Sequence, residues 1–250
     1  MAIHNARSQR LYVEADLESG ATIGCSSEQS NYLRNVLRLA DGDEVRLFNG
    51  RAGEWLAELA TVGRRGCGLT VTRQVRPQEG GPDVHYLFAP LKRARLDYMV
   101  QKATEMGVAR LVPVLTERTV AERVNLERMR ANAIEAAEQC GILRLPEIGE
   151  PQRLERIIRG WDHSRKLVFC DESAERQDPI AALSGIPAGG PIALLIGPEG
   201  GFGAAERDLL LAQPFTVRLS LGPRVMRADT AAVAALALIN AVIGDWRSRG

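Results

Sequence analysis

Two glycine-bearing segments near the C-terminus of this 250-residue chain constrain its fold more than any other feature. They read LLIGPEGGFGAAE at 194–206 and LSLGPRVMRADTAAVAAL at 219–236. Each begins with an apolar run typical of a buried strand, breaks at glycine and continues in an alanine-rich helical pattern. We therefore expect two strand–turn–helix units whose turns lie side by side at one edge of a parallel sheet. Such turns would line a ligand pocket with backbone.

The glycines of these turns let the backbone approach a ligand closely. Four glycines are candidates for this role, namely Gly197, Gly200, Gly201 and Gly222. A Cβ at any of these positions would fill the space next to the ligand or disfavour a positive φ. Tight turns of any α/β protein use glycine in the same way, so the spacing alone leaves both interpretations open. Neither G-x-G-x-x-G, read from Gly197 or Gly201, nor G-x-x-x-x-G-K-[ST] is found, so a dinucleotide or nucleoside triphosphate site is a poor match.

The first third of the chain has the pattern of a small β domain. Short alternating β runs fill residues 11–76 and are separated by turn signals such as DGD and NG, which predicts a small β-barrel. Residues 26–39 interrupt these runs with helical spacing, and Ser26 or Ser27 is the expected N-cap. The segment RPQEGGPD at 76–83 is typical of a linker.

The remainder of the chain alternates apolar strands with helical patterns, which indicates an α/β domain with a mainly parallel sheet. The expected strands are VHYLFAPL, ARLVPVL, KLVFCDE, IALLIG and TVRLSL. In the first helical pattern, Leu96, Met99, Val100 and Ala103 recur at i, i+3, i+4 and i+7. This stripe is expected to face the core.

Composition excludes several classes of protein. The longest apolar stretch, residues 231–243, is too short for a transmembrane helix, and the first residues contain no apolar signal-peptide core. We therefore expect a cytoplasmic protein without a membrane partner. The four cysteines and three histidines are scattered and contain no C-x-x-C pair, so no metal site is expected.

Four blocks, in order along most of the chain, resemble one family. GPEGGF and the following L-x-LG-x-R-x-x-R-x-(E/D)-TA pattern resemble the RsmE family, the uridine-N3 methyltransferases of small-subunit ribosomal RNA within the SPOUT superfamily. Residues 92–118 resemble the family's K…QKatElGv block, residues 135–148 its EAaEQ block, and residues 32–55 its VLR…GDe segment. Four ordered blocks are far more specific than any single one.

The chain departs from the family pattern at a few positions. Asn31 and Tyr32 stand where the family usually carries histidine, and Met129 stands where it carries tryptophan. Asp229 replaces the usual glutamate and has a shorter reach, while Gly203 replaces a serine and is itself an acceptable N-cap. The histidine loss concerns only RNA contacts of the small domain.

The resemblance implies a fold and an activity for each part. Residues 1–76 would form a PUA-like β-barrel that binds RNA, and residues 77–250 a SPOUT methyltransferase domain whose last strand and helix form a trefoil knot. The implied enzyme is a homodimer with its cofactor pocket close to the subunit interface. It would use S-adenosylmethionine (SAM) and no metal to methylate uridine N3 in 16S ribosomal RNA, within an assembled or nearly assembled 30S particle. The alternatives are another SPOUT RNA methyltransferase, acting on ribose 2′-O or another base, and a non-catalytic RNA-binding protein.

Candidate catalytic residues follow from this chemistry. A sulfonium methyl group is already activated, so transfer requires in-line placement of the nucleophile and removal of the N3 proton. The resulting imide anion would be stabilised by a fixed cation, for which Arg227 and Arg224 are candidates. Glu199 and Asp229 are the carboxylates best placed to accept a proton. Either arginine could instead pair structurally with Asp229 or the sheet edge, and Asp229 or Thr230 could simply cap the last helix, which is the favoured interpretation of Asp229.

Two further sets of residues complete the expected site. The expected cofactor-binding residues are Leu195, Ile196, Gly197, Gly200, Gly201, Leu219, Leu221, Gly222, Met226, Thr230 and Ala231. The expected RNA-binding residues are Arg34, Arg38, Arg64, Arg65, Lys92 and Arg93. Of the second set, Arg34 and Arg38 are expected on one face of the small domain's helix.

Overall fold

A computed structural model describes residues 9–63, 66–120, 123–174 and 178–247. The chain divides into two compact units. The N-terminal unit contains Met1–Gly80 and Ala137–Arg144, and the C-terminal unit contains Gly81–Ala136 and Leu145–Gly250. None of the helices among the described residues combines the length and the apolar character needed to cross a membrane.

The N-terminal unit is built on a five-stranded sheet with the order β1-β3-β4-β5-β2. Its strands are β1 (Arg10–Tyr12), β2 (Thr22–Gly24), β3 (Glu44–Phe48), β4 (Glu54–Val62) and β5 (Gly66–Arg76). Strand β1 runs parallel to β3, and the other neighbours are antiparallel. All five strands contribute to one apolar core, which includes Leu11, Ile23, Val45, Ala57 and Leu69.

A helical segment between β2 and β3 matches the predicted start but not the predicted end. Helix α1 (Ser27–Asn31) begins at Ser26, whose Oγ accepts from the Gln29 amide at 3.1 Å. It continues as a π-helical turn, η1 (Tyr32–Val36), and ends where Arg38 has a φ of 59°. The expected helix over 26–39 is therefore shorter, and Arg38 lies beyond it. Arg34 and Arg38 do not share a helix face.

A buried ion pair crosses the N-terminal sheet. The Arg10 Nε and Arg46 Nη1 atoms donate to Glu54 at 2.6 and 3.1 Å, and no part of the Glu54 side chain is exposed. Burial alone would raise the pKa of the Glu54 carboxyl, but the Arg10 and Arg46 guanidiniums lower it below its ordinary value. The carboxylate therefore stays charged inside the unit, where it neutralises Arg10.

We expect Glu54→Ala to destabilise the N-terminal unit by about 3–5 kcal/mol, because it removes the carboxylate that is hydrogen-bonded to the buried Arg10 guanidinium. The exposed pair of Asp16 and Arg51 provides the control, since Asp16→Ala should cost less than about 1 kcal/mol. Hydrogen exchange of the β3 and β4 amides measures both changes.

The same carboxylate makes stability depend on pH. Because the pKa of Glu54 is lowered in the folded state, the stabilisation that its charge provides is present at neutral pH and is lost as the pH falls through that folded pKa. The difference in the free energy of unfolding between wild type and Glu54→Gln should become smaller on acidification. A difference that does not change with pH would contradict this account.

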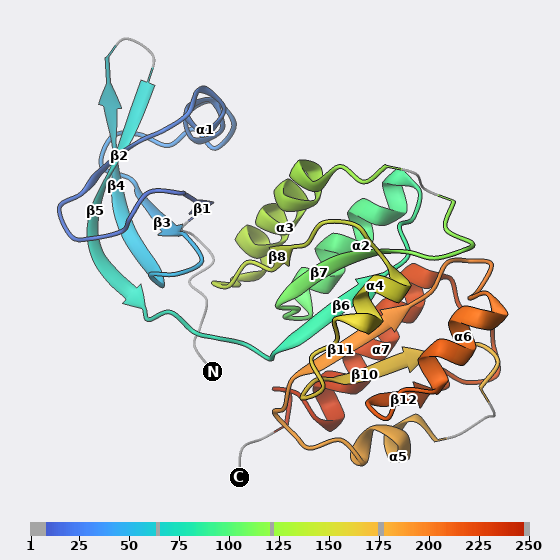
Figure 1. The fold of residues 1–250 in the computed structure, drawn as a ribbon. Coiled ribbons are helices and arrows are strands. Elements are labelled where there is room, and N and C mark those ends of the chain that lie inside the picture. Colours follow the sequence, from blue (N-terminus) through green and yellow to red (C-terminus); the bar gives the residue numbers. More distant parts are fainter. Residues whose placement is uncertain (1–8, 64–65, 121–122, 175–177, 248–250) are drawn as a thin grey trace. The chain divides into compact units, whose positions relative to one another are not determined.

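The C-terminal unit is built on a parallel sheet, as the alternating pattern predicts. Its strand order is β12-β10-β11-β6-β7-β8, and β9 pairs with β7 (Figure 1). The strands are β6 (Val84–Phe88), β7 (Arg110–Leu115), β8 (Glu147–Ile148), β9 (Gln152–Arg153), β10 (Lys166–Cys170), β11 (Ile192–Ile196) and β12 (Thr216–Leu219). All the ladders between them are parallel.

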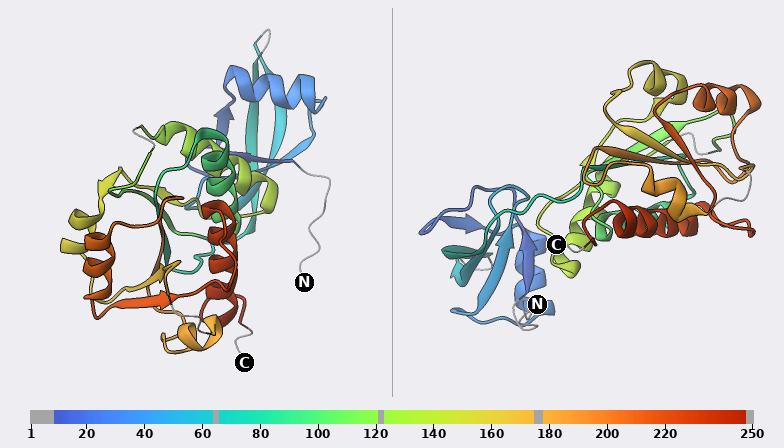
Figure 2. Two further views of the ribbon diagram at one scale, coloured as in Figure 1. Left: turned by 90° about the vertical axis from the view of Figure 1, so that its right-hand side faces the viewer. Right: turned by 90° about the horizontal axis from the view of Figure 1, so that it is seen from below.

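Helices cover both faces of this sheet (Figure 2). They are α2 (Arg93–Glu105), α3 (Leu126–Cys140), α4 (Leu154–Arg159), α5 (Pro179–Ser184), α6 (Ala204–Leu211) and α7 (Ala228–Val242). Of α3, residues 126–136 belong to this unit. Successive residues of β11 point to opposite faces: Ile192, Leu194 and Ile196 pack with α2, α5 and α7, whereas Ala193 and Leu195 pack with α4 and α6. A strand buried on both faces is apolar throughout, which explains the continuous run IALLI.

The predicted core stripe of α2 is confirmed in the same way. Met99, Val100 and Ala103 are buried in the core, and Leu96 packs against it while remaining half-buried. Helix α2 therefore lies flat against the sheet and against α7. Because α2 follows shortly after β6, its first turn lies at the edge of the sheet where the strands end.

Candidate cofactor pocket and basic surfaces

A pocket lies at the carboxyl ends of three neighbouring strands, β10, β11 and β12. Open parallel sheets bind ligands at this edge, because successive strand-to-helix turns meet there. Three stretches of chain line the pocket: Cys170–Ser173 at the end of β10, Ile196–Phe202 at the end of β11 and Leu219–Ala228 at the end of β12. Within these stretches, Gly200 and Arg227 do not line it. Arg207 of α6 completes the wall.

The two glycine turns are in this pocket, but they are not direct neighbours. Strand β10 lies between β11 and β12, so its own turn separates the two that the sequence predicts to be side by side. The expected adjacency is therefore wrong in detail, although both turns line one pocket. Strand order depends on contacts between distant segments, and no local pattern reports it.

The turn after β11 requires glycine at two positions. Gly201 has a φ of 69°, and its amide donates to the Pro198 carbonyl at 2.9 Å. A Cβ at Gly201 would lie 2.2 Å from the Glu172 Oε1 atom, and a Cβ at Gly197 would lie 2.4 Å from the Phe202 ring. Side chains at these two positions would therefore fill the space between the turns.

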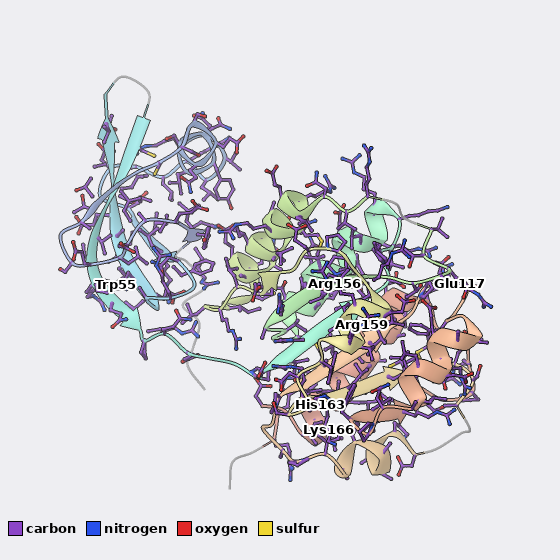
Figure 3. The ribbon with its side chains drawn as sticks, in the orientation of Figure 1. Trp55, Glu117, Arg156, Arg159, His163 and Lys166 are labelled. Atoms are coloured by element: carbon purple, nitrogen blue, oxygen red, sulfur yellow. The ribbon has the colours of Figure 1, made fainter. Side chains whose placement is uncertain are left out.

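A buried carboxylate holds this turn against the end of β7. Glu206 in the first turn of α6 accepts from the Gly203 amide at 3.0 Å and from the Glu117 amide at 2.8 Å. Glu117, labelled in Figure 3, follows β7, so one side chain joins two separate connections of the sheet. Gly203 is the N-cap residue of α6, as expected from its position.

The turn after β12 is open and carries both candidate arginines. Gly222 has a φ of 95° and no atom within 4 Å of an added Cβ, so its space is free. Arg224 lines the pocket, whereas Arg227 lies outside its lining, and both are exposed. Among the described residues neither arginine has an ion pair, so the structural pairing with Asp229 is not observed. Val225 between them is 92% exposed.

The start of the last helix differs from the expected cap. Helix α7 has Arg227 at its N-cap position, with no hydrogen bond from a capping side chain. Asp229 lies inside the first turn, where its carboxylate accepts from the Thr230 amide at 2.9 Å. The interpretation of Asp229 or Thr230 as the N-cap is therefore wrong, although Asp229 still satisfies one amide at the positive end of the helix.

The β10 turn contributes a buried charged cluster that the sequence reasoning missed. The Asp171 side chain is 3% exposed and accepts from Arg207 at 2.9 Å and from Arg218 at 3.0 Å. Its Oδ1 also accepts from the Ser173 amide at 3.0 Å. Burial would raise the pKa of Asp171, but the Arg207 and Ser173 hydrogen bonds lower it. The acidic run that follows the apolar KLVFC strand was the available signal, since all strand ends of a parallel sheet meet at one edge.

Most of the expected cofactor residues lie in or beside the pocket. Those that line it are Ile196, Gly197, Gly201, Leu219, Leu221, Gly222 and Met226. Leu195 is buried within β11, and Thr230 and Ala231 lie in the first turn of α7, outside the lining. Gly200 is exposed, and its carbonyl accepts from Arg118 at 2.7 Å. Glu199 lines the pocket, and its carboxylate is paired with Arg95 of α2.

The expected RNA-binding residues have different environments. The Arg34 guanidinium contacts Asp41 and donates to the Leu39 carbonyl at 2.9 Å and to the Thr61 hydroxyl at 3.1 Å. It therefore stabilises its own turn, whereas Arg38 is exposed. Arg64 and Arg65 lie outside the described residues. Lys92 and Arg93 are exposed at the start of α2.

Comparison with known proteins agrees with this arrangement. Residues 79–240 match the RNA methyltransferase domain family, and residues 26–71 match the RNA methyltransferase PUA domain. The ribosomal RNA small subunit methyltransferase E of Rickettsia conorii is 30% identical over 92% of this chain and 94% of its own length.

Solved structures give the same result. A Legionella pneumophila methyltransferase, solved with bound SAM, is 30% identical and superposes with a TM-score of 0.83 over 96% of this chain and 99% of its own. The ribosomal RNA small subunit methyltransferase E of Neisseria gonorrhoeae, also bound to SAM, has a TM-score of 0.85 at 23% identity over 96% of this chain and 100% of its own, and it supports the fold.

A parallel α/β unit with a glycine-lined pocket at its strand ends, accompanied by a PUA-like β unit, defines an RNA methyltransferase of the SPOUT type. The family comparisons agree in every part of the chain that they cover. The chain belongs to the ribosomal RNA small subunit methyltransferase E family, abbreviated RsmE.

Proposed function

We propose that this protein transfers a methyl group from SAM to the N3 atom of a uridine in small-subunit (16S) ribosomal RNA. The observation that carries the proposal is the pocket formed by three turns at the ends of β10, β11 and β12. The R. conorii relative is named as a small-subunit ribosomal RNA methyltransferase, and the L. pneumophila relative binds SAM. Both cover more than nine-tenths of this chain.

The residues of the pocket fit SAM. Gly197 and Gly201 leave the space that a side chain would fill, so main-chain groups can reach an adenosine. Ile196, Leu221 and Met226 provide apolar contacts for an adenine ring. Bound there, SAM would supply a methyl group that is already activated by its positively charged sulfur.

The chain's own residues then have to bind the nucleotide and stabilise charge. Removal of the N3 proton spreads negative charge onto the two flanking carbonyl oxygens of uracil. Arg227 and Arg224 are the proposed donors to that charge, because each is exposed beside the pocket and neither has an ion pair within the described residues. A donor whose charge is not already neutralised interacts more strongly with a developing anion.

The proton acceptor is proposed among the nearby carboxylates. Glu199 lines the pocket but is paired with Arg95, and Asp229 already accepts from the Thr230 amide. Asp229 can keep this hydrogen bond on one oxygen while its second oxygen accepts a proton. It lies two residues beyond Arg227, so acid–base and charge-stabilising groups would come from the same turn.

The domain roles and assembly extend the proposal. We propose residues 1–76 as the RNA-binding PUA-like domain and residues 77–250 as the methyltransferase domain, whose last strand and helix form a trefoil knot. The proposed enzyme is a homodimer that acts on an assembled or nearly assembled 30S particle, and this substrate would place it in the cytoplasm. Helix α7, which follows edge strand β12, packs on α2 and β11, and this return toward the middle of the sheet supports the proposed knot.

Mass-spectrometric mapping of ribosomal RNA tests the function directly. Small subunits from a strain that lacks the modification are incubated with the protein and isotopically labelled SAM. We expect one labelled N3-methyluridine in the small-subunit RNA and none in a reaction without protein. Label on a ribose 2′-oxygen, on another base or on large-subunit RNA would contradict the proposal, and so would no label.

A further inference from the structure

A second depression in the C-terminal unit lies beside the start of α2, and we call it the α2 hollow. Its apolar floor is formed by Leu91, Leu96 and Met129. Three cationic side chains stand around it, namely Lys92, Arg93 and Arg123. The hollow thus combines an apolar base with a positively charged rim.

The three rim cations are not used by the fold. Arg128, which also borders the hollow, is neutralised by Asp97 through two hydrogen bonds of 2.7 and 2.6 Å. By contrast, no hydrogen bond or ion pair holds the side chains of Lys92, Arg93 or Arg123 within the described part of the chain, and all three are exposed. Arg128 therefore has a structural role, whereas Lys92 and Arg123 are free for a ligand, and Arg93 interacts electrostatically with Asp97 but keeps its hydrogen-bond donors available.

The position of these charges is unfavourable for the helix itself. Lys92 is the N-cap residue of α2, Arg93 is its first residue, and the first turn contains no acidic side chain. Cations at the positive end of a helix dipole destabilise the helix, and Lys92 forms no capping hydrogen bond. Helix stability therefore does not explain these side chains, whereas an anionic ligand would.

The α2 hollow is directly linked to the cofactor pocket. Arg95, the third residue of α2, contacts the carboxylate of Glu199, which lines the pocket. On the neighbouring connection, Arg118 donates to the carbonyl of Gly200 at 2.7 Å. The start of α2 therefore lies beside the cofactor pocket.

We propose that the α2 hollow binds one unpaired nucleotide of the substrate RNA next to the target uridine. The base would lie on the floor of Leu91, Leu96 and Met129, and the phosphates would be bound by Lys92, Arg93 and Arg123. Single-strand recognition usually combines a positively charged groove for the phosphates with flat side chains, such as aromatic rings or arginine planes, on which unstacked bases lie. In the α2 hollow, arginine planes and the aliphatic floor would take this second role. This proposal rests on the proposed function, because it takes the pocket to be the site of RNA methylation.

The test compares two triple variants that lose the same charge. The hollow variant is Lys92→Gln/Arg93→Gln/Arg123→Gln. The control variant is Arg153→Gln/Arg156→Gln/Arg159→Gln, which removes three exposed arginines on and beside α4; Arg156 and Arg159 are labelled in Figure 3. Fluorescence anisotropy measures binding of a labelled 16-nucleotide oligouridylate, alone and annealed to oligoadenylate.

We expect the hollow variant to bind the single strand about tenfold more weakly than wild type at physiological salt. The slope of log affinity against log salt should fall by about two for three lost phosphate contacts. Preference for single strand over duplex should fall with it, because a paired nucleotide cannot enter the hollow. The control variant should retain both the wild-type affinity for the single strand and this preference.

Sedimentation of the hollow variant and methylation mapping of the wild-type protein separate the possible outcomes. Equal losses in both variants would overturn the proposal, and so would a wild-type protein that does not bind the single strand. A changed sedimentation coefficient in the hollow variant would assign the hollow to an interface with a second copy and would also overturn it. Mapping of methylation by wild-type protein tests the proposed function independently, since it does not depend on either variant.

Discussion

Replacing Gly201 by valine is expected to abolish SAM binding while the C-terminal unit stays folded. Gly201 has a φ of 69°, a conformation that is strongly disfavoured for β-branched residues. The new Cβ would also lie 2.2 Å from Glu172 Oε1. The Glu172 side chain can move aside, but the turn between Pro198 and Gly201 cannot keep its shape. The pocket wall would therefore change while the sheet beneath it is preserved.

Gly189→Val is the matched control for this substitution. Gly189 has a φ of 74° and no atom within 4 Å of an added Cβ, and it lies outside the lining of the cofactor pocket. It therefore imposes the same backbone strain at a distance from the proposed ligand. Calorimetric titration with SAM should show wild-type affinity for Gly189→Val and no binding for Gly201→Val, with circular dichroism unchanged in both. Unaltered affinity in the Gly201 variant would remove the turn from the site.

Replacing Arg227 by alanine is expected to slow methyl transfer by about two to three orders of magnitude, the loss typical when one preorganised donor is removed. Arg227 is exposed at the N-cap of α7 and forms no capping hydrogen bond, so its removal should cost little stability. The measurement is single-turnover methylation of small subunits at saturating RNA and SAM. SAM affinity should change much less, because Arg227 does not line the pocket.

The pH dependence of the variant provides a second readout. Rising pH should partly restore its rate, because hydroxide can deprotonate uridine N3 without the stabilising charge. Arg224→Ala is the comparison, since Arg224 does line the pocket and its loss should affect SAM affinity more. If SAM affinity of Arg227→Ala falls in step with its rate, Arg227 is a cofactor ligand and the imide-stabilising role passes to another cation.

Local pattern was sufficient to predict the five longer strands of the C-terminal sheet, because their signal lies within a few neighbouring residues, but it missed the two-residue strands β8 and β9. The IALLI run is apolar at every position, and the structure buries all five residues between two helical layers. The order of the strands was not accessible in this way. Nothing in the sequence near residue 196 indicates that β10 lies between β11 and β12, because that order is set by packing between distant segments.

The sequence predicted the parts of the candidate site in which glycine is needed for a positive φ. It did not predict ion pairs between residues that are far apart in the sequence. Gly201 and Gly222 were identified from sequence and both have positive φ. Asp171 was not identified, because its role depends on Arg207 and Arg218, which are 36 and 47 residues away. The end of the small domain's helix was also missed, since Arg38 adopts a left-handed conformation that its residue type does not indicate.

The types of side chain in the cofactor pocket bear on how pH–rate data are interpreted. Among the described residues that line it there is no histidine, the side chain whose ordinary pKa is nearest neutrality. Burial raises the pKa of the Cys170 thiol, and the Arg207 hydrogen bond helps to lower the pKa of Asp171, so both groups move away from the neutral range. Neither of these two lining groups is therefore shifted toward neutrality by its surroundings. An inflection in the methylation rate near neutrality would therefore have to come from other groups, and in the proposed reaction the candidates are the uracil N3 atom and the carboxylate that accepts its proton.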